Sequence, residues 1–80
     1  MTSFDARLRM IGQGGLPLGV EIDLTDERMT VKSGDSEVAD WALEEIKISS
    51  RPDGFHIEAE GEEVIVNVTD DALFALEAGL

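Results

Sequence analysis

The sequence predicts a mainly β fold, in which seven antiparallel strands form a barrel or sandwich that one C-terminal helix caps. Apolar residues recur at every second position between Phe4 and Val68, in short runs that turn residues separate. After Thr69 the apolar spacing changes to that of a helix. All connections are short, which favours antiparallel pairing of neighbouring strands. We assign residues 1–80 to one domain, because a chain of this length holds a single core.

The first three predicted strands alternate apolar and polar residues without interruption. They are residues 4–10, 20–24 and 29–31. The segment Gly12–Pro17 separates the first two strands and predicts a hairpin loop, and its glycines do not have the spacing of a phosphate-binding loop. Residues 25–27 and 32–36 contain the residue types expected in turns.

The later strands are irregular at two places. Val38 and Trp41 cannot lie on the same face of a strictly alternating strand, so we expect a bulge or bend there. Ile65 interrupts the alternation of the last predicted strand, which favours a strand covered on both faces. Four strands are predicted in this part of the chain, at residues 37–41, 46–48, 55–59 and 64–68, with a tight turn at residues 51–54.

The end of the sequence carries consistent helix signals. Thr69 is the predicted N-cap, and the two aspartates that follow it suit the positive end of the helix dipole. Leu73, Phe74 and Leu76 give the helix an apolar side, and Gly79 is placed to end it. A helix of about nine residues is not stable alone in water, so we expect it to pack on the strands as a lid.

The charge is strongly negative, with 18 Asp and Glu against 6 Lys and Arg and a formal net charge of −12. Such a surface repels phosphate polyanions and anionic lipids, so we expect neither nucleic acid nor a membrane as a partner. The charge serves either solubility or attraction of a basic partner. The chain has no cysteine and no apolar stretch of membrane-spanning length, which favours a cytoplasmic protein without disulfides.

The segment from Asp40 to Ile48 is similar to the start of a strand in small bacterial pleckstrin-homology-like (PH-like) domains, where tryptophan precedes an acidic residue and isoleucine. The segment from Gly54 to Phe74 resembles their last hairpin and helix. The resemblance implies seven antiparallel strands in two nearly orthogonal sheets, closed by a C-terminal helix. Lipid-binding PH domains carry basic residues around the first hairpin, whereas the loop Gly12–Pro17 has none.

Four residues are candidates for partner binding. Trp41 is either an anchor at an interface or part of a small core, because tryptophan is common in both settings. Phe74 lies on the apolar side of the predicted helix, next to a possible groove at a sheet edge. Arg7 and Arg9 form a basic patch if their outward faces adjoin those of other basic residues. The alternative is that basic residues pair across strands with Glu21 and Asp23.

One set of residues is a candidate metal site. His56, Glu58 and Glu60 alternate along a predicted strand, and imidazole with carboxylates binds divalent cations. Residues two apart on a strand are separated by about 6–7 Å, so a solvated polar face is the alternative. His56 is the only histidine, and no nucleophile is singled out for it, so we expect no enzyme and no cofactor.

These observations favour a non-enzymatic module with a PH-like fold that binds protein or peptide. One candidate partner is a second copy of the chain, which would join through an exposed strand edge to form a homodimer. The alternative is an acidic protein that binds divalent cations, or that mimics nucleic acid and binds a basic partner.

Overall fold

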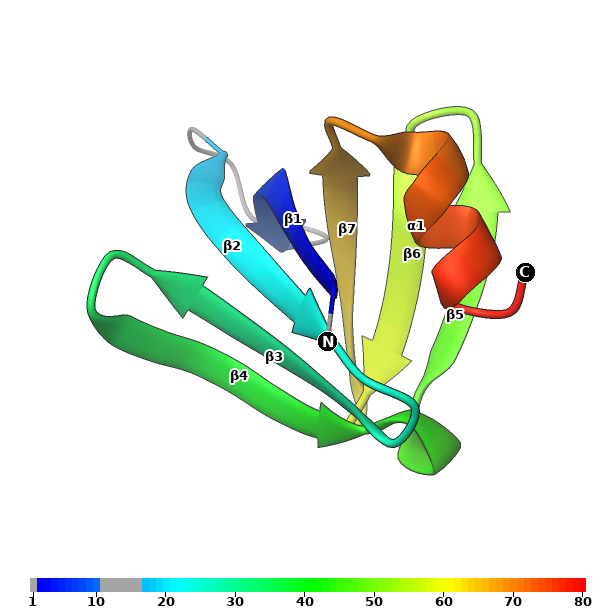
Figure 1. Ribbon diagram of the computed structural model, residues 1–80, viewed down its shortest axis with the longest axis horizontal. Helices are drawn as coiled ribbons and strands as arrows, with labels where there is room; N and C mark the ends of the chain where they lie inside the picture. The colour runs from blue at the N-terminus through cyan, green and yellow to red at the C-terminus, as the bar shows by residue number, and fades with distance from the viewer. Residues whose placement is uncertain (1, 11–16) are drawn as a thin grey trace.

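The computed structural model describes residues 2–10 and 17–80 (Figure 1). Their order of elements is seven strands, a 3₁₀ turn within the series, and one helix. The strands are β1 (Thr2–Met10), β2 (Leu18–Leu24), β3 (Arg28–Ser33), β4 (Ser36–Ala42), β5 (Lys47–Arg51), β6 (Gly54–Ala59) and β7 (Glu62–Val68). The 3₁₀ turn η1 is Leu43–Glu45 and the helix α1 is Asp71–Glu77. The predicted loop between the first two strands lies outside the described residues up to Leu16.

The strands form one antiparallel sheet in the order β4-β3-β2-β1-β7-β6-β5. The seven strands and the terminal helix confirm the predicted fold class. The expected pairing of neighbours fails in one place, because β4 and β5 follow each other in sequence but lie at opposite ends of the sheet order. The turn η1 joins them, with the amide of Leu43 donating to the carbonyl of Glu27 at 2.8 Å.

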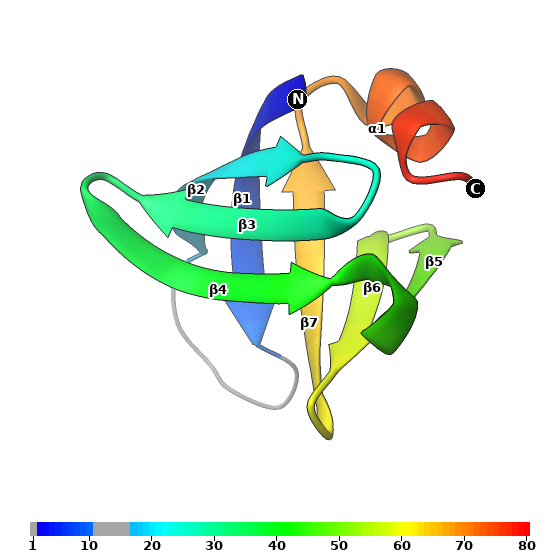
Figure 2. The ribbon, with the colours of Figure 1, turned by 60° about the horizontal axis from the view of Figure 1, so that its bottom comes forward.

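Strand β1 curls the sheet because it pairs with two neighbours along different parts of its length. Its residues from Thr2 to Leu8 face β2, and those from Ala6 to Met10 face β7. The halves β1–β4 and β5–β7 therefore diverge and face each other across the curl (Figure 2). The result is a curled half-barrel whose two edges are β4 and β5.

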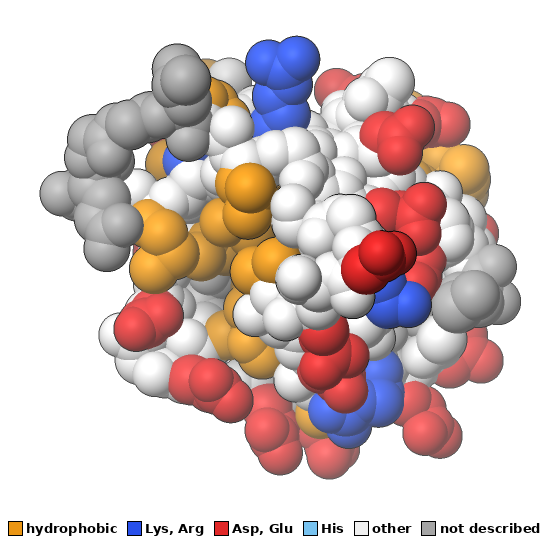
Figure 3. All heavy atoms as spheres, turned by 90° about the vertical axis from the view of Figure 1, so that its left-hand side faces the viewer, with side chains coloured by type: hydrophobic (Ala, Val, Ile, Leu, Met, Phe, Trp, Pro, Cys, Tyr) orange, Lys and Arg blue, Asp and Glu red, His pale blue; other side chains and the backbone are white. Residues whose placement is uncertain are grey.

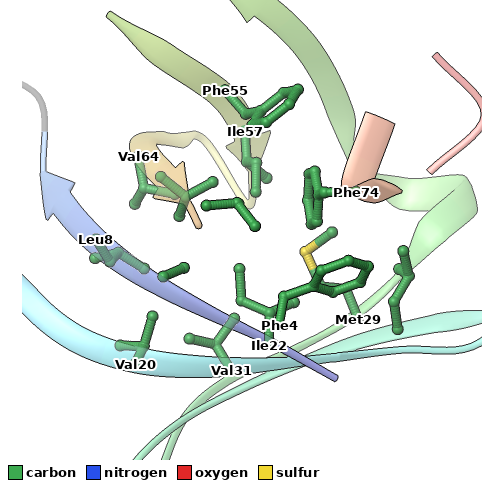
Figure 4. Close-up of a cluster of buried hydrophobic side chains, with 14 residues drawn as sticks. Phe4, Leu8, Val20, Ile22, Met29, Val31, Phe55, Ile57, Val64 and Phe74 are labelled. Atoms are coloured by element: carbon green, nitrogen blue, oxygen red, sulfur yellow. The ribbon is translucent and has the colours of Figure 1, made fainter. Parts of the chain in front are cut away.

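The core fills the inside of the curl. Figure 4 shows Ile22, Met29 and Val31 from one half facing Phe55 and Ile57 from the other. Among the described residues, all five of these side chains belong to one buried cluster, which Phe74 of the helix completes. Strand β7 carries three consecutive buried residues, and Ile65 is one of them, so the predicted coverage on both faces is confirmed at the middle of the strand.

The helix begins one residue later than predicted. Asp70 is the N-cap, and its carboxylate accepts a hydrogen bond from the amide of Leu73 at 3.3 Å. The amide of Thr69 donates to the carbonyl of Asp5 on β1 at 3.0 Å, which continues the pairing of β7 with β1 one residue further before the helix begins. At the other end Gly79 has φ +78°, and the amides of Gly79 and Leu80 donate to carbonyls of the last turn. This is a Schellman ending, and it confirms the predicted stop.

Candidate functional site

A groove of about 400 Å³ lies between the edge strand β4 and the β6–β7 hairpin. Ala39 and Trp41 border it on the β4 side, and Ile57 and Val64 lie at its base. Ile57 and Val64 are buried and face each other across β6 and β7. We call this hollow the β4 groove; its lining is Glu37, Val38, Ala39, Asp40, Trp41, Ile57, Ala59, Glu60, Glu62 and Val64.

A bulge in β4 places an apolar side chain at the groove. Lys32 pairs with Glu37 and Val31 pairs with Ala39, so Val38 is an extra residue without a partner on β3. This confirms the predicted irregularity between Val38 and Trp41. Val38 lines the groove and is 44% exposed.

Trp41 lies at the junction of the core and the groove. It pairs with the buried Met29 on β3, packs against the core, and remains partly exposed at the groove. The side chain therefore belongs partly to the core, and a role of Trp41 as an anchor at an interface stays a prediction. As the only tryptophan of the chain, it is also a fluorescent reporter of what occupies the groove.

The rim of the groove is acidic on both sides. Glu37 and Asp40 lie on β4, while Glu60 and Glu62 lie on the β6–β7 hairpin, and all four are exposed. Asp40 accepts a hydrogen bond from Nε of Arg28 at 2.8 Å, which raises the pKa of Arg28. The other three have no ion-pair partner within the part of the chain that the structure describes. Figure 3 shows apolar side chains gathered on the side of the β3–β4 hairpin, with acidic side chains along their lower border.

The turn between β6 and β7 holds one rim residue in an unfavourable backbone conformation. Ala59 pairs with Glu62, so Glu60 and Gly61 form a two-residue turn with φ of 53° and 79°. Positive φ at both positions is typical of the type I′ turn, where asparagine and glycine are favoured. A glutamate in this conformation costs about 1 kcal/mol, because its Cβ approaches the backbone.

The two candidate arginines lie on β1, away from the β4 groove. Arg7 lines a broader hollow of about 740 Å³ on the outer face of β1, β2 and β7. Asp5, Glu21 and Lys32 line the same hollow, so acidic and basic groups alternate there. Arg9 donates to the backbone carbonyl of Asp53 at 3.2 Å. The two side chains therefore do not form a continuous basic patch.

The expected pairing of basic residues with acidic ones across strands occurs between Lys32 and Asp23. The ammonium group of Lys32 lies 3.6 Å from the carboxylate of Asp23. Asp23 is buried, and its other oxygen accepts a hydrogen bond from Ser3 Oγ at 2.6 Å. Among the described residues, every buried side-chain nitrogen or oxygen has a hydrogen-bond partner, so the core itself presents no unpaired polar group.

Phe74 belongs to the core and not to a binding surface. Its side chain is fully buried, and its ring lies 5.3 Å from that of Phe4 and 4.8 Å from that of Phe55. The sequence shows that the helix has an apolar side but not which residue enters the core. Leu76, which shares the apolar pattern, is 73% exposed.

The structure does not bring His56, Glu58 and Glu60 together. His56 Nδ1 lies 2.9 Å from Glu63 and His56 Nε2 lies 2.7 Å from Asp53, so its two ring nitrogens face opposite carboxylates. Hydrogen bonds to Glu63 and then Asp53 raise the pKa of His56, and the bond from His56 lowers the pKa of Asp53. Within residues 2–10 and 17–80, no three such side chains are placed to hold a metal ion.

Comparisons with known proteins add no further assignment: no protein-family model matches the chain, and no curated protein sequence matches it. The described residues contain no helix that is long and apolar enough to cross a membrane.

Sequence reasoning found Trp41 and the bulge but missed the acidic rim. Glu37 and Asp40 are far in sequence from Glu60 and Glu62, and only the curl of the sheet brings the two pairs to one groove. A partial signal was present, because the segment Ser36–Ala42 contains no lysine, arginine or proline, the residues that usually protect an edge strand.

Proposed function

We propose that this protein is a non-enzymatic interaction module that binds an extended segment of a partner polypeptide. The segment adds to the sheet beside β4 and places alternate side chains in the β4 groove. The observation that carries this proposal is the position of β4 at the end of the sheet order, directly beside a groove.

An edge strand can bind peptide because its outer N–H and C=O groups have no strand to pair with. An added strand satisfies these groups, and main-chain hydrogen bonds of this kind supply affinity without regard to sequence. Side chains of the added strand alternate between the two faces of the sheet, so every second one enters the groove. The groove thereby supplies the specificity.

Of the two edges, β4 is better suited to this role than β5. Strand β5 has five residues and carries Lys47 and Arg51 at its ends, and short, positively charged edges are protected from strand addition. Strand β4 has seven residues, carries no lysine, arginine or proline, and exposes Val38 in its bulge.

We further propose that the scaffold is a PH-like one. The curled antiparallel sheet and the C-terminal helix support this, together with the similarity of the segment from Asp40 to Ile48 to such domains. The absence of catalysis is also a proposal, which the pairing of His56 with two carboxylates rather than a hydroxyl supports. The alternative of a cation-binding protein has no convergent ligand set among the described residues.

A peptide library displayed on phage and selected against the immobilised protein tests the proposed function. The selected peptides are then measured against the variants Val38→Pro and Val38→Ala. Proline cannot donate a main-chain hydrogen bond, and edge strands and bulges tolerate it. Alanine keeps the backbone and removes only two methyl groups.

We expect selected peptides to lose binding to Val38→Pro, with at most a severalfold loss for Val38→Ala. Circular dichroism and thermal unfolding of both variants establish that the sheet persists. Peptides that bind a folded Val38→Pro variant as well as they bind the original protein would contradict strand addition at β4.

A further inference from the structure

We infer that the segment bound at the β4 groove is cationic, with lysine or arginine at alternate positions and small apolar residues between them. This inference rests on the proposed strand addition and adds the chemical class of the partner. It follows from the acidic rim, from the apolar base of the groove, and from the charge of the whole chain.

An added strand beside β4 lies between two pairs of carboxylates. Glu37 and Asp40 are on the strand that it pairs with, and Glu60 and Glu62 are on the hairpin across the groove. Since the apolar side chains of such a strand enter the groove, its basic side chains project from the other face, beside Glu37 and Asp40. Glu60 and Glu62 attract them through the longer-range field at low salt. Each exposed ion pair strengthens binding by up to about fivefold, and salt weakens it.

The base of the groove selects the residues between the basic ones. Ile57 and Val64 lie at the base, and Trp41 and Val38 border it on the β4 side. These side chains are apolar, so burying a charged or amide side chain against them leaves polar groups without partners. Valine or isoleucine fits this position and also favours the extended conformation that strand addition needs.

The same charges argue against a second copy of this chain as the occupant. Pairing β4 of one copy with β4 of another brings two acidic rims together, in molecules that each carry a formal charge of −12. Like charges placed opposite each other across strands destabilise the pair. A basic segment of a different protein meets the rim with the opposite sign.

Glu60 supports the importance of charge at this rim. Asparagine or glycine is more stable in a turn with positive φ, yet a glutamate occupies the position and its carboxylate borders the groove. Backbone strain beside a surface indicates a role for the strained residue at that surface.

Three synthetic peptides as long as β4, capped at both ends, test the inference. In the first, lysine alternates with valine; in the second, threonine replaces lysine; in the third, glutamate replaces lysine. Binding is followed by the fluorescence of Trp41, at low and at high salt. We expect the lysine peptide to bind at least about tenfold more tightly than the threonine peptide at low salt, and this difference to shrink at high salt. We expect no detectable binding of the glutamate peptide.

Matched variants distinguish the effect of the rim carboxylates on binding from the effect of the total charge of the chain. Glu62→Lys changes the charge at the rim, and Glu21→Lys makes the same change on the outer face, between Asp5 and Lys32. We expect Glu62→Lys to weaken binding of the lysine peptide at least about fivefold and to leave the affinity for the threonine peptide unchanged. Glu21→Lys is expected to weaken the lysine peptide less than twofold.

Two outcomes would overturn the inference and leave strand addition intact: equal affinity of the lysine and threonine peptides, or equal losses in Glu62→Lys and Glu21→Lys. A concentration-dependent dimer in analytical ultracentrifugation that Val38→Pro abolishes would also overturn it, in favour of a second copy. Failure of the proposed function looks different, because affinity for the lysine peptide would then not depend on Val38→Pro at all.

Discussion

The end of the half-barrel beneath the helix and the side along β4 are built in opposite ways. Beneath the helix, Phe74 contacts rings from β1 and β6, and the helix has both an N-cap and a Schellman ending. Along β4, the sheet has an edge, Val38 is exposed, and acidic side chains surround the groove. One region is closed by packing, and the other leaves its polar backbone and some apolar surface accessible.

The difference indicates how a chain of 80 residues separates its packed core from an accessible sheet edge. A small domain buries a limited fraction of its surface, so its core must be compact and well packed where it exists. The helix concentrates this packing at one end. The turn η1 leads the chain away from β4 before β5 begins, so the sheet does not close and β4 remains available.

The largest expected effect is at the closed end. Phe74→Ala removes a fully buried ring that contacts two others, and we expect a loss of about 3–5 kcal/mol in the free energy of unfolding. Leu76→Ala is the matched control, because that side chain is 73% exposed and its loss should cost less than about 0.5 kcal/mol. Urea unfolding followed by circular dichroism measures both. Similar losses in the two variants would mean that the helix is not held by Phe74.

A second large effect is expected at the β5–β6 turn. Gly54 has φ +131°, and a Cβ there would lie 2.7 Å from Asn67 Nδ2 and 2.8 Å from the carbonyl of Val66. Because a backbone atom cannot move aside, Gly54→Ala should cost about 3 kcal/mol or more. Gly34→Ala is the control: φ is +60° but no atom lies within 4 Å, so only about 1 kcal/mol for the backbone conformation is expected. Equal unfolding midpoints for the two variants would contradict the steric argument.

The contrast between the two regions also marks what the sequence predicts. Periodicity together with turn residues located every strand and the terminal helix, because alternation, turn chemistry and helical spacing are local properties of the chain. The buried position of Phe74 and the convergence of Glu37 with Glu60 depend on how the sheet curls. Short-range signals also misplaced the helix cap by one residue, because Thr69 is a good capping residue that instead continues the pairing with β1. Local chemistry therefore predicted the elements, and long-range pairing determined the site.

A smaller effect is expected from the cluster of His56, Asp53 and Glu63, which ties the β5–β6 turn to β7. Both carboxylates accept hydrogen bonds best from the protonated ring, and they raise the pKa of His56 above 6.5. This stabilisation is fully present below pH 6.5, the ordinary pKa of the group, and is lost as the pH rises through the raised pKa. The hydrogen bond from His56 lowers the pKa of Asp53 from 3.8. The stabilisation that Asp53 contributes is therefore present above pH 3.8 and is lost as the pH falls through the lowered pKa.

We therefore expect the melting temperature to decline on the alkaline side of pH 6.5 in a way that His56→Gln does not share. Glutamine keeps a hydrogen-bonding side chain that does not titrate. Thermal unfolding across this range, at constant ionic strength, measures the difference between the two proteins. If the difference in melting temperature stays constant with pH, the cluster does not stabilise the fold through the charge of His56.

The smallest effect has the opposite sign and lies on the open side. Glu60→Asn places a residue that tolerates positive φ into the β6–β7 turn, so we expect a gain of about 0.5–1 kcal/mol in the free energy of unfolding. The same change removes a rim carboxylate, so the lysine peptide should bind more weakly. Glu60→Gln separates the two contributions, because it removes the charge and leaves the backbone strain.

Glu60→Gln should leave stability unchanged to within about 0.5 kcal/mol and should weaken the lysine peptide as much as Glu60→Asn does. Urea unfolding and peptide titration of both variants complete the comparison. A gain in stability accompanied by a loss of binding would place Glu60 among residues that serve the groove at the expense of the fold. A stability gain without any loss of binding would show that the carboxylate of Glu60 takes no part in recognition, and would restrict the acidic rim to Glu37, Asp40 and Glu62.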